Sequence, residues 1–433
     1  MKIQTALTLA SAGAGTPNFA APKLESLAIS GGQKAVTFPL KEHNALIEWP
    51  RYGAEEKQRV CELIDSNKFY DELPLLEKEW KDYHQVPYVK SHHNGTSTLA
   101  SMYFALSLDF PPGSEVLVPS QTFFATIMPM RILGFVPVFV DCDPRTANFD
   151  VEHAAKVITP KTVALVPVHW GGLPCDMDSL MAFAKEKGLV LCEDCAHCHG
   201  ASMHGKKLGT FGQMSIFSFQ ATKPLPSIEG GMGMYQTREY YERAAAYGHY
   251  EDPIKFGEDS PYWQYKGTGF GQKLRMHPLA AAIARMQLRK LDKINEGVNR
   301  RVRQLNDRIK HLPGLREPDC PADAQRVYYN HNTWFLDAEK AGFTRDQLCK
   351  ALRAEGVKVT EGDYRQQHTC KVYHEAKWWH HAPKIPDRLP GSDQINRTRF
   401  HLPLFYEDCP DLIDQYVKAF EKVWAHKAEV AKL

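Results

Sequence analysis

The sequence lacks the features that define several large classes of protein. It has no marked excess of charge, because 53 Lys and Arg against 51 Asp and Glu leave a net charge of +2. We therefore expect neither a nucleic acid nor a membrane surface as partner. No segment approaches the roughly 18 consecutive apolar residues of a membrane helix. Ten cysteines scattered over 433 residues indicate reduced thiols rather than a disulfide framework.

What remains is the composition of an ordinary soluble globular protein, with 43% hydrophobic and 24% charged residues. The length predicts two domains. Residues 6–10 are apolar and follow a single lysine, which only faintly resembles a secretory signal. We predict an N-terminal arm over residues 1–48, of which the first 25 are disordered or loosely attached, and a cytoplasmic location.

The middle of the chain alternates short apolar runs with helix-length segments. The expected strands cover Glu115–Pro119 and residues 136–141, 163–168, 189–192 and 214–219, and helices are expected over 126–133, 178–187 and from 278 through 291 and beyond. This alternation predicts parallel βαβ units and a sheet covered on both faces, in a large domain over residues 49–300. In such sheets ligands bind outside the carboxyl ends of the strands.

The character changes after Pro313-Gly314. A short strand over Asn332–Leu336 and a helix over 345–355, followed by Gly356-Val357-Lys358-Val359, predict a smaller α+β domain over residues 301–433.

One cysteine cluster invites a metal interpretation. Cys192, Cys195 and Cys198 are spaced as in some iron–sulfur sites, but the later cysteine followed by proline is missing. Because Cys192 continues a buried strand, we expect the cysteines to pack as small hydrophobes and predict no metal.

Lys223 follows the apolar run Phe217-Ser218-Phe219 and precedes Glu229-Gly230-Gly231. A lysine at the end of a buried strand suits a nucleophile for carbonyl groups, although a surface charge is the ordinary alternative.

Gly95 and Thr96 open a helical pattern and could bind an anion at the helix N-terminus or merely cap it. Asp194 directly follows a buried strand, so it needs a cation or hydrogen-bond donors.

Together these segments resemble the DegT/DnrJ/EryC1/StrS family of pyridoxal-phosphate sugar aminotransferases. The similarity begins near Trp49 and extends to the C-terminus. It rests on these segments: Asn94-Gly95-Thr96, Pro119-Ser120-Gln121-Thr122-Phe123, Glu193-Asp194-Cys195-Ala196-His197, Phe217-Ser218-Phe219 through Lys223, and Glu229-Gly230-Gly231. The resemblance implies the fold type I architecture of pyridoxal-phosphate-dependent transferases.

The resemblance also implies roles for individual residues. Lys223 is expected to hold pyridoxal 5'-phosphate as an aldimine and to shuttle a proton, and Asp194 to pair with the pyridinium nitrogen. The expected cofactor-binding set is completed by His197 beside the ring, Phe123 stacked on it, and Gly95, Thr96 and Ser218 around the phosphate. The family often has an Asn that reaches the neighbouring subunit's phosphate; here Lys273 occupies that position. We therefore expect a homodimer in which Lys273 takes this role.

The implied reaction is a ping-pong transamination from L-glutamate or L-glutamine to a ketone. The acceptor is a nucleotide-linked keto-sugar or a cyclitol ketone such as scyllo-inosose, which Leu27-Ala28-Ile29-Ser30-Gly31-Gly32 slightly favours. Two alternatives remain: a sugar dehydratase or aromatase with the same cofactor, and a non-catalytic regulator that kept the fold. Lys223 argues against dehydratases that carry histidine in its place.

Overall fold

The computed structural model describes residues 25–433; part of the predicted N-terminal arm, residues 1–24, lies outside the described residues. A seven-stranded sheet forms the centre of the larger domain. Its strands, in spatial order, are β1 (Tyr88–His92), β9 (Gly231–Tyr235), β8 (Met214–Ser218), β5 (Val190–Asp194), β4 (Thr162–Leu165), β2 (Glu115–Pro119) and β3 (Val136–Val140). Only β9 runs antiparallel to its neighbours, so the predicted mostly parallel sheet is confirmed.

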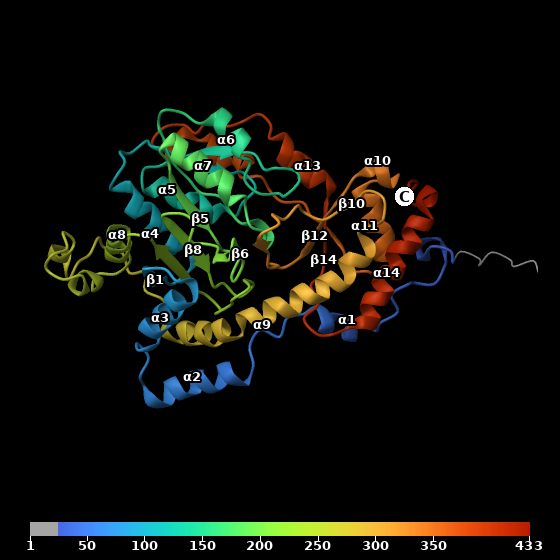
Figure 1. Cartoon of the computed structure of the whole chain (residues 1–433), viewed down its shortest axis with the longest axis horizontal. Helices are drawn as coiled ribbons and strands as arrows, with labels where there is room; N and C mark the ends of the chain where they lie inside the picture. The colour runs from blue at the N-terminus through green and yellow to red at the C-terminus, as the bar shows by residue number, and fades with distance from the viewer. Residues whose placement is uncertain (1–24) are drawn as a thin grey trace, which may run out of the picture.

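Helices pack around this sheet, except that α2 (Ala54–Ser66) lies against α9 (Pro278–Ile309), and α9 itself continues into the second domain (Figure 1). The others are α3 (Glu72–His84), α4 (Gly95–Ser107), α5 (Met128–Ile132), α6 (Val151–Val157), α7 (Met177–Lys187) and α8 (Arg238–Gly248). Helix α9 has 32 residues, so it is about 48 Å long at 1.5 Å per residue. It contacts α2 and α3 of the large domain and α14 of the small one. It also passes through the predicted boundary at residue 300, and the domain boundaries remain a prediction.

The smaller domain is built on a four-stranded antiparallel sheet, as an α+β domain. Its strands, in order, are β10 (Leu315–Arg316), β12 (Asn332–Leu336), β14 (Arg399–Leu402) and β13 (Thr360–Glu361). The helices of this part are α1 (Leu40–Ile47), α10 (Ala338–Ala341), α11 (Arg345–Ala354), α13 (Pro390–Thr398), α14 (Pro410–Ala425) and α15 (Lys427–Val430). Helix α12 (Lys371–His374) packs instead on the large domain, where Tyr373 is buried against Phe139 of β3. Strand β12 has the predicted bounds, whereas residues 356–359 precede the short strand β13.

Short elements complete the chain. A small sheet contains β11 (Ala324–Gln325), β6 (Ser202–Met203) and β7 (Lys206–Lys207). The 3-10 helices are η1 (Ala28–Ser30), η2 (Phe124–Thr126), η3 (Trp170–Gly172), η4 (Asp252–Lys255), η5 (Trp263–Tyr265), η6 (Gln367–Thr369) and η7 (Ala376–Trp378). Within residues 25–433, no helix combines the length and the hydropathy that a membrane span requires.

Two predicted elements are shorter than expected. The helix predicted over 126–133 is divided between η2 and α5, and the strand predicted over 163–168 ends at Leu165. Pro167 lacks the N–H that a central strand must donate, which explains the early end of β4. Its carbonyl still accepts a hydrogen bond from the N–H of Asp194 at 2.9 Å, so this segment stays next to β5.

The described part of the N-terminal arm packs on the small domain. Leu27, Ala35 and Val36 are buried in the core that α11 and α14 form. The buried carboxylate of Glu355 accepts hydrogen bonds from the N–H groups of Ala28 and Ala35, at 2.7 and 3.0 Å. A buried acid with these donors holds the arm in place.

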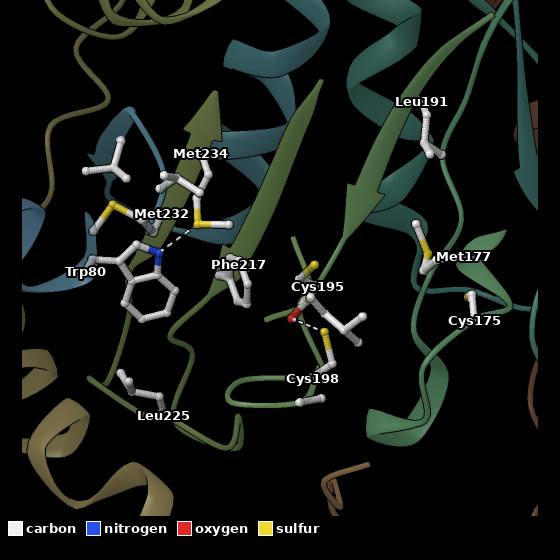
Figure 2. Packing of buried hydrophobic residues seen from close by; sticks show 14 of the residues in the cluster. Trp80, Cys175, Met177, Leu191, Cys195, Cys198, Phe217, Leu225, Met232 and Met234 are labelled. Atoms are coloured by element: carbon white, nitrogen blue, oxygen red, sulfur yellow. Dashed lines mark hydrogen bonds between the residues drawn. The ribbon is translucent and has the colours of Figure 1, made fainter. Parts of the chain in front are cut away.

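The core beneath the large sheet fixes the strand that leads to Lys223. Trp80 of α3 is fully buried and makes edge-to-face contacts with Phe217 and Phe219, with ring centroids 5.0 and 5.1 Å apart. Its indole N–H donates to the sulfur of Met234 at 3.2 Å (Figure 2). Aromatic packing of this kind confines both neighbouring strands, so the carboxyl end of β8 has a defined position.

Candidate active site

A cavity of about 700 Å³ opens at the carboxyl ends of the parallel strands and is closed on its far side by the small domain. Most of the residues that the sequence predicts for the site line it: Gly95, Thr96, Phe123, Asp194, His197, Ser218 and Lys223. The small domain contributes a wall that sequence reasoning missed, with His331, Thr333, Tyr364 and His401. This position agrees with the general rule for ligand sites in open α/β sheets.

The N-terminus of α4 provides donors for an anion. The side chain of Asn94 caps the helix by accepting the N–H of Ser97 at 2.8 Å. Helix geometry leaves the first N–H groups, those of Gly95 and Thr96, without intrahelical acceptors. Both residues line the cavity, so these N–H groups and the helix dipole favour a phosphate there.

Gly95 is required by the close approach of α4 to β8. A Cβ atom on Gly95 would lie 2.8 Å from the Cβ atom of Ser218. We expect Gly95→Ala to destabilise the protein by about 1–3 kcal/mol, the range for overpacked sites, and to weaken cofactor binding. The measurements are urea unfolding and a cofactor titration followed by absorbance.

Gly297→Ala in the interior of α9 is the matched control. Its Cβ would meet only the end of the flexible Arg301 side chain, at 3.0 Å. Alanine is the better helix former, so this variant should be slightly more stable and should bind cofactor normally. Normal cofactor affinity in Gly95→Ala would contradict the assignment of the α4 N-terminus as the phosphate site.

Asp194 lies at the end of β5. Its side chain is buried, and hydrogen bonds orient both carboxylate oxygens. Oδ2 accepts the Thr126 hydroxyl at 2.8 Å and Oδ1 accepts the N–H of Ala196 at 3.1 Å. Burial raises the pKa of Asp194, and the hydrogen bonds and the charge of Lys223 oppose that shift. A buried carboxyl in this state gains most from a cation placed against it. Thr126 was not predicted from the sequence, because its role depends on the contact between η2 and β5.

Lys223 lies in the loop after β8 and lines the cavity. The loop is anchored by backbone hydrogen bonds from Lys223 to Gln220 at 2.8 Å and from Ser227 to Phe219 at 2.7 Å. Leu225 next to the lysine is fully buried in the core. A half-buried lysine on an anchored loop is unlike a freely solvated surface lysine, so the structure supports the nucleophile interpretation.

His197 is buried beside Lys223 and is neutral. Desolvation, and then the charge of Lys223, holds the pKa of His197 well below its usual range. Its ring stacks on Tyr329 with centroids 4.1 Å apart and meets the edge of Trp170. Its Nδ1 atom is buried without a hydrogen-bond partner in the described part of the chain. An orphaned atom of this kind fits a polar group of a ligand.

For two other predicted residues, Phe123 and Lys273, the structure gives fewer contacts that bear on their expected roles. Phe123 lines the cavity with 51% of its surface exposed, so its ring is available for stacking. Lys273 is exposed, forms a β-bridge with His249 and does not line the cavity of its own chain. A contact with a neighbouring subunit remains a prediction for Lys273.

Cys195 and Cys198 lie in the hydrophobic core of the large domain (Figure 2), and Cys192 is buried in a second core cluster. Ligand atoms of His169, Cys195 and Cys198 are within 4.8 Å of one another, and all three residues are buried. Both ring nitrogens of His169 are engaged: Nδ1 accepts the N–H of Cys175 at 3.1 Å, and Nε2 faces Glu193 at 3.2 Å. Burial raises the pKa of the Cys195 thiol well above its usual range. These contacts favour the packing interpretation over a metal site.

The residues around the cavity fit pyridoxal phosphate. The start of α4 offers N–H donors to a phosphate, and Asp194 offers a buried carboxylate to a cationic ring nitrogen. His197 has a free ring nitrogen, and Lys223 supplies a primary amine for an aldehyde. The fold and this cavity together define a pyridoxal-phosphate-dependent enzyme of fold type I.

The model of the DegT/DnrJ/EryC1/StrS aminotransferase family matches residues 50–421. The chain belongs to this family and is a pyridoxal-phosphate-dependent aminotransferase. The family, fold, enzyme class and cofactor predicted from the sequence are thereby confirmed.

Known relatives share most of their length with this chain. It is 28% identical over 378 residues to the spore coat polysaccharide biosynthesis protein SpsC of Bacillus subtilis (strain 168), covering 86% of this chain and 95% of that protein. It is 29% identical over 391 residues to the dTDP-4-dehydro-2,3,6-trideoxy-D-glucose 4-aminotransferase of Saccharopolyspora spinosa, covering 87% and 96%. The crystal structure of an aminotransferase from Psychrobacter cryohalolentis superimposes with a TM-score of 0.78 at 26% identity, covering 88% and 99%.

Proposed function

We propose that this aminotransferase moves an amino group from L-glutamate or L-glutamine to a keto-sugar or a cyclitol ketone by a ping-pong mechanism. The observation that carries the proposal is the convergence of Lys223, Asp194 and the start of α4 on one cavity. Pyridoxal phosphate, when bound, would supply the electron sink and carry the nitrogen between the two half-reactions.

Each of the residues at the cavity would then have a defined role in the reaction. Lys223 Nζ would take the proton from the carbon that bears the donor's amino group and return a proton on the other side of the nitrogen. Asp194 would keep a proton on the ring nitrogen, held in orientation by Thr126. The N–H groups of Gly95 and Thr96 would bind the phosphate in the cavity that Lys223 also lines.

A sugar acceptor is supported by the names of the relatives, and polar groups of the small-domain wall could bind its hydroxyls. One relative is named as the 4-aminotransferase of a nucleotide-linked 2,3,6-trideoxy keto-sugar, and the other for polysaccharide biosynthesis. Desolvation lowers the pKa of both His331 and His401, whose rings stack with centroids 4.5 Å apart. The Thr333 hydroxyl lies 3.1 Å from His401 Nδ1. Neutral imidazoles and hydroxyls of this kind can exchange hydrogen bonds with sugar or cyclitol hydroxyls.

We further propose a homodimer in which Lys273 acts in the neighbouring subunit's site. Lys273 is exposed and does not line the cavity of its own chain, which supports this arrangement. Lys223→Ala and Lys273→Ala proteins should each be impaired, and hybrid dimers formed on mixing them should regain activity because one site of the pair is intact. Absence of any regain, with subunit exchange shown by sedimentation of tagged chains, would contradict the shared site.

A cytoplasmic location also remains a proposal. All ten cysteines are free, which supports a reducing compartment.

The experiment that tests the function follows the absorption of the cofactor-loaded protein. L-glutamate or L-glutamine should change the spectrum and release the matching keto acid, and an acceptor should restore it. Nucleotide-linked keto-sugars and inososes are compared as acceptors. No spectral change with any amino acid would overturn the transaminase proposal, and loss of water from a sugar without an amino donor would favour the dehydratase.

A further inference from the structure

A tyrosine from the far side of the cavity contacts the amine of Lys223. The Nζ atom of Lys223 lies 3.3 Å from the hydroxyl oxygen of Tyr329 and 4.4 Å from the centroid of its ring. The same hydroxyl lies 3.1 Å from the Thr222 hydroxyl. Lys223 and Tyr329 are 106 residues apart in the sequence, so only the fold brings them together.

The position of Tyr329 is fixed by its backbone and its ring. The N–H groups of Val327 and Tyr329 donate to the carbonyls of Gly172 and Gly171 in η3, at 3.1 and 3.3 Å. A Cβ atom on Gly172 would lie 2.5 Å from the Val327 carbonyl oxygen, so this close approach requires glycine. On its other side the Tyr329 ring stacks on His197. Because the Tyr329 side chain has a fixed position, it can restrict the position of the Lys223 side chain that it contacts.

We propose that Tyr329 is a positioning residue for the amine of Lys223. Its hydroxyl and ring hold that amine at the cavity whenever the amine is not bonded to the cofactor. This inference rests on the proposed function, in which Lys223 must be free to carry a proton. A lysine side chain has four rotatable bonds and loses considerable entropy when it is confined. A fixed partner such as Tyr329 confines the amine beforehand, so less entropy is lost when Lys223 reaches its reactive conformation.

The other titratable groups near Lys223 are less suited to this task. Asp194 is committed to Thr126 and Ala196. His197 and His199 are buried neutral rings whose pKa values are held low by desolvation and then by the charge of Lys223. Glu229 also lines the cavity, but no hydrogen bond or ion pair joins it to Lys223 in the described residues. The Tyr329 hydroxyl is therefore the group that meets Nζ directly.

The variant Tyr329→Phe distinguishes the effect of the hydroxyl on Lys223 from the packing of the ring. Phenylalanine keeps the ring that stacks on His197 and removes only the hydroxyl. Tyr328→Phe is the matched control, because Tyr328 is the adjacent residue and packs against Val298, Val302 and Leu404 outside the cavity.

Two measurements are made on the full-length protein. The first is the donor half-reaction of the cofactor-loaded enzyme, for which we expect the limiting rate of Tyr329→Phe to fall about 10- to 100-fold at nearly unchanged KM, the range for one charge-assisted hydrogen bond. The second is the labelling of Lys223 in cofactor-free protein by an amine-reactive reagent, read by peptide mass spectrometry. Labelling should be faster in Tyr329→Phe, because the amine is released from its partner, and unchanged in Tyr328→Phe.

The outcomes distinguish this inference from the function on which it rests. A wild-type protein that shows no spectral change with donors overturns the proposed function. A wild-type protein that reacts while Tyr329→Phe matches it in limiting rate and labelling overturns the role of Tyr329. A higher KM at unchanged limiting rate would also overturn it, because the hydroxyl would then bind substrate rather than position Lys223.

Discussion

Replacing Lys223 with alanine is expected to abolish amino transfer, with a rate loss of about 10³-fold or more. Alanine removes both the amine that bonds to the cofactor and the group that moves the proton, and each contribution is large. The cofactor should still bind, because the start of α4 and Asp194 are unchanged, but the spectrum of the lysine-bound form should be missing. Absorbance and a coupled keto-acid assay measure both effects.

Lys223→Arg is the informative companion. Arginine keeps the positive charge beside Asp194 and Tyr329, but the guanidinium is not deprotonated in proteins and cannot take the proton. It should be as inactive as alanine while preserving the stability of the cofactor-free protein. Substantial transfer by either variant would contradict the assignment of Lys223 as the reacting lysine.

Asp194→Asn should produce the second largest effect on activity. The amide is nearly isosteric but lacks the charge that would hold a proton on the cofactor's ring nitrogen. Removing one partner of a buried charge pair costs about 3–5 kcal/mol, so we expect amino transfer to slow by about 10²- to 10⁴-fold. Single-turnover rates with L-glutamate, measured on fully loaded protein, check this expectation.

The same substitution should stabilise the cofactor-free protein at neutral pH. Burial raises the pKa of Asp194 above its ordinary value of 3.8, so the folded state holds this proton more tightly than the unfolded state does. The stability contributed by Asp194 is therefore lost as the pH rises above that ordinary value, and the loss is complete above the raised pKa. Urea unfolding between acid and neutral pH should show this trend in wild type and a weaker trend in Asp194→Asn.

Asp150→Asn controls for the chemical change. Asp150 caps α6 by accepting the N–H of His153 at 3.0 Å, and asparagine caps a helix equally well. This variant should match wild type in rate. If Asp194→Asn also matched wild type in rate, the ring nitrogen would need another partner, and the assigned role of Asp194 would be wrong.

The sequence was sufficient to predict the sheet and seven of the residues that line the cavity on the side of the large domain. Strands β2, β8 and β12 were predicted within one residue, because they are short, fully buried apolar runs with clear boundaries. Asp194 and Lys223 were identifiable because each follows such a strand. The predicted bounds were less accurate for β4, which ends before Pro167, and for α5, which is preceded by the separate turn η2.

Contacts between distant segments could not be read from the sequence. Thr126 lies 68 residues from Asp194, and Tyr329 lies 106 residues from Lys223. Neither has a local signal, since a threonine in a turn and a tyrosine before a strand are ordinary residues. The wall formed by His331 and His401 likewise exists only because β12 and β14 pair.

By itself, then, the sequence determined the strand ends and the chemistry placed at them: a lysine, a buried acid and a helix start, spaced along a βαβ chain. Local periodicity and side-chain chemistry encode these features. The tertiary structure alone decided which groups hold that chemistry in position, because packing and hydrogen bonds between segments far apart in the chain have no period along it. The partners of Asp194 and Lys223 belong to this second group.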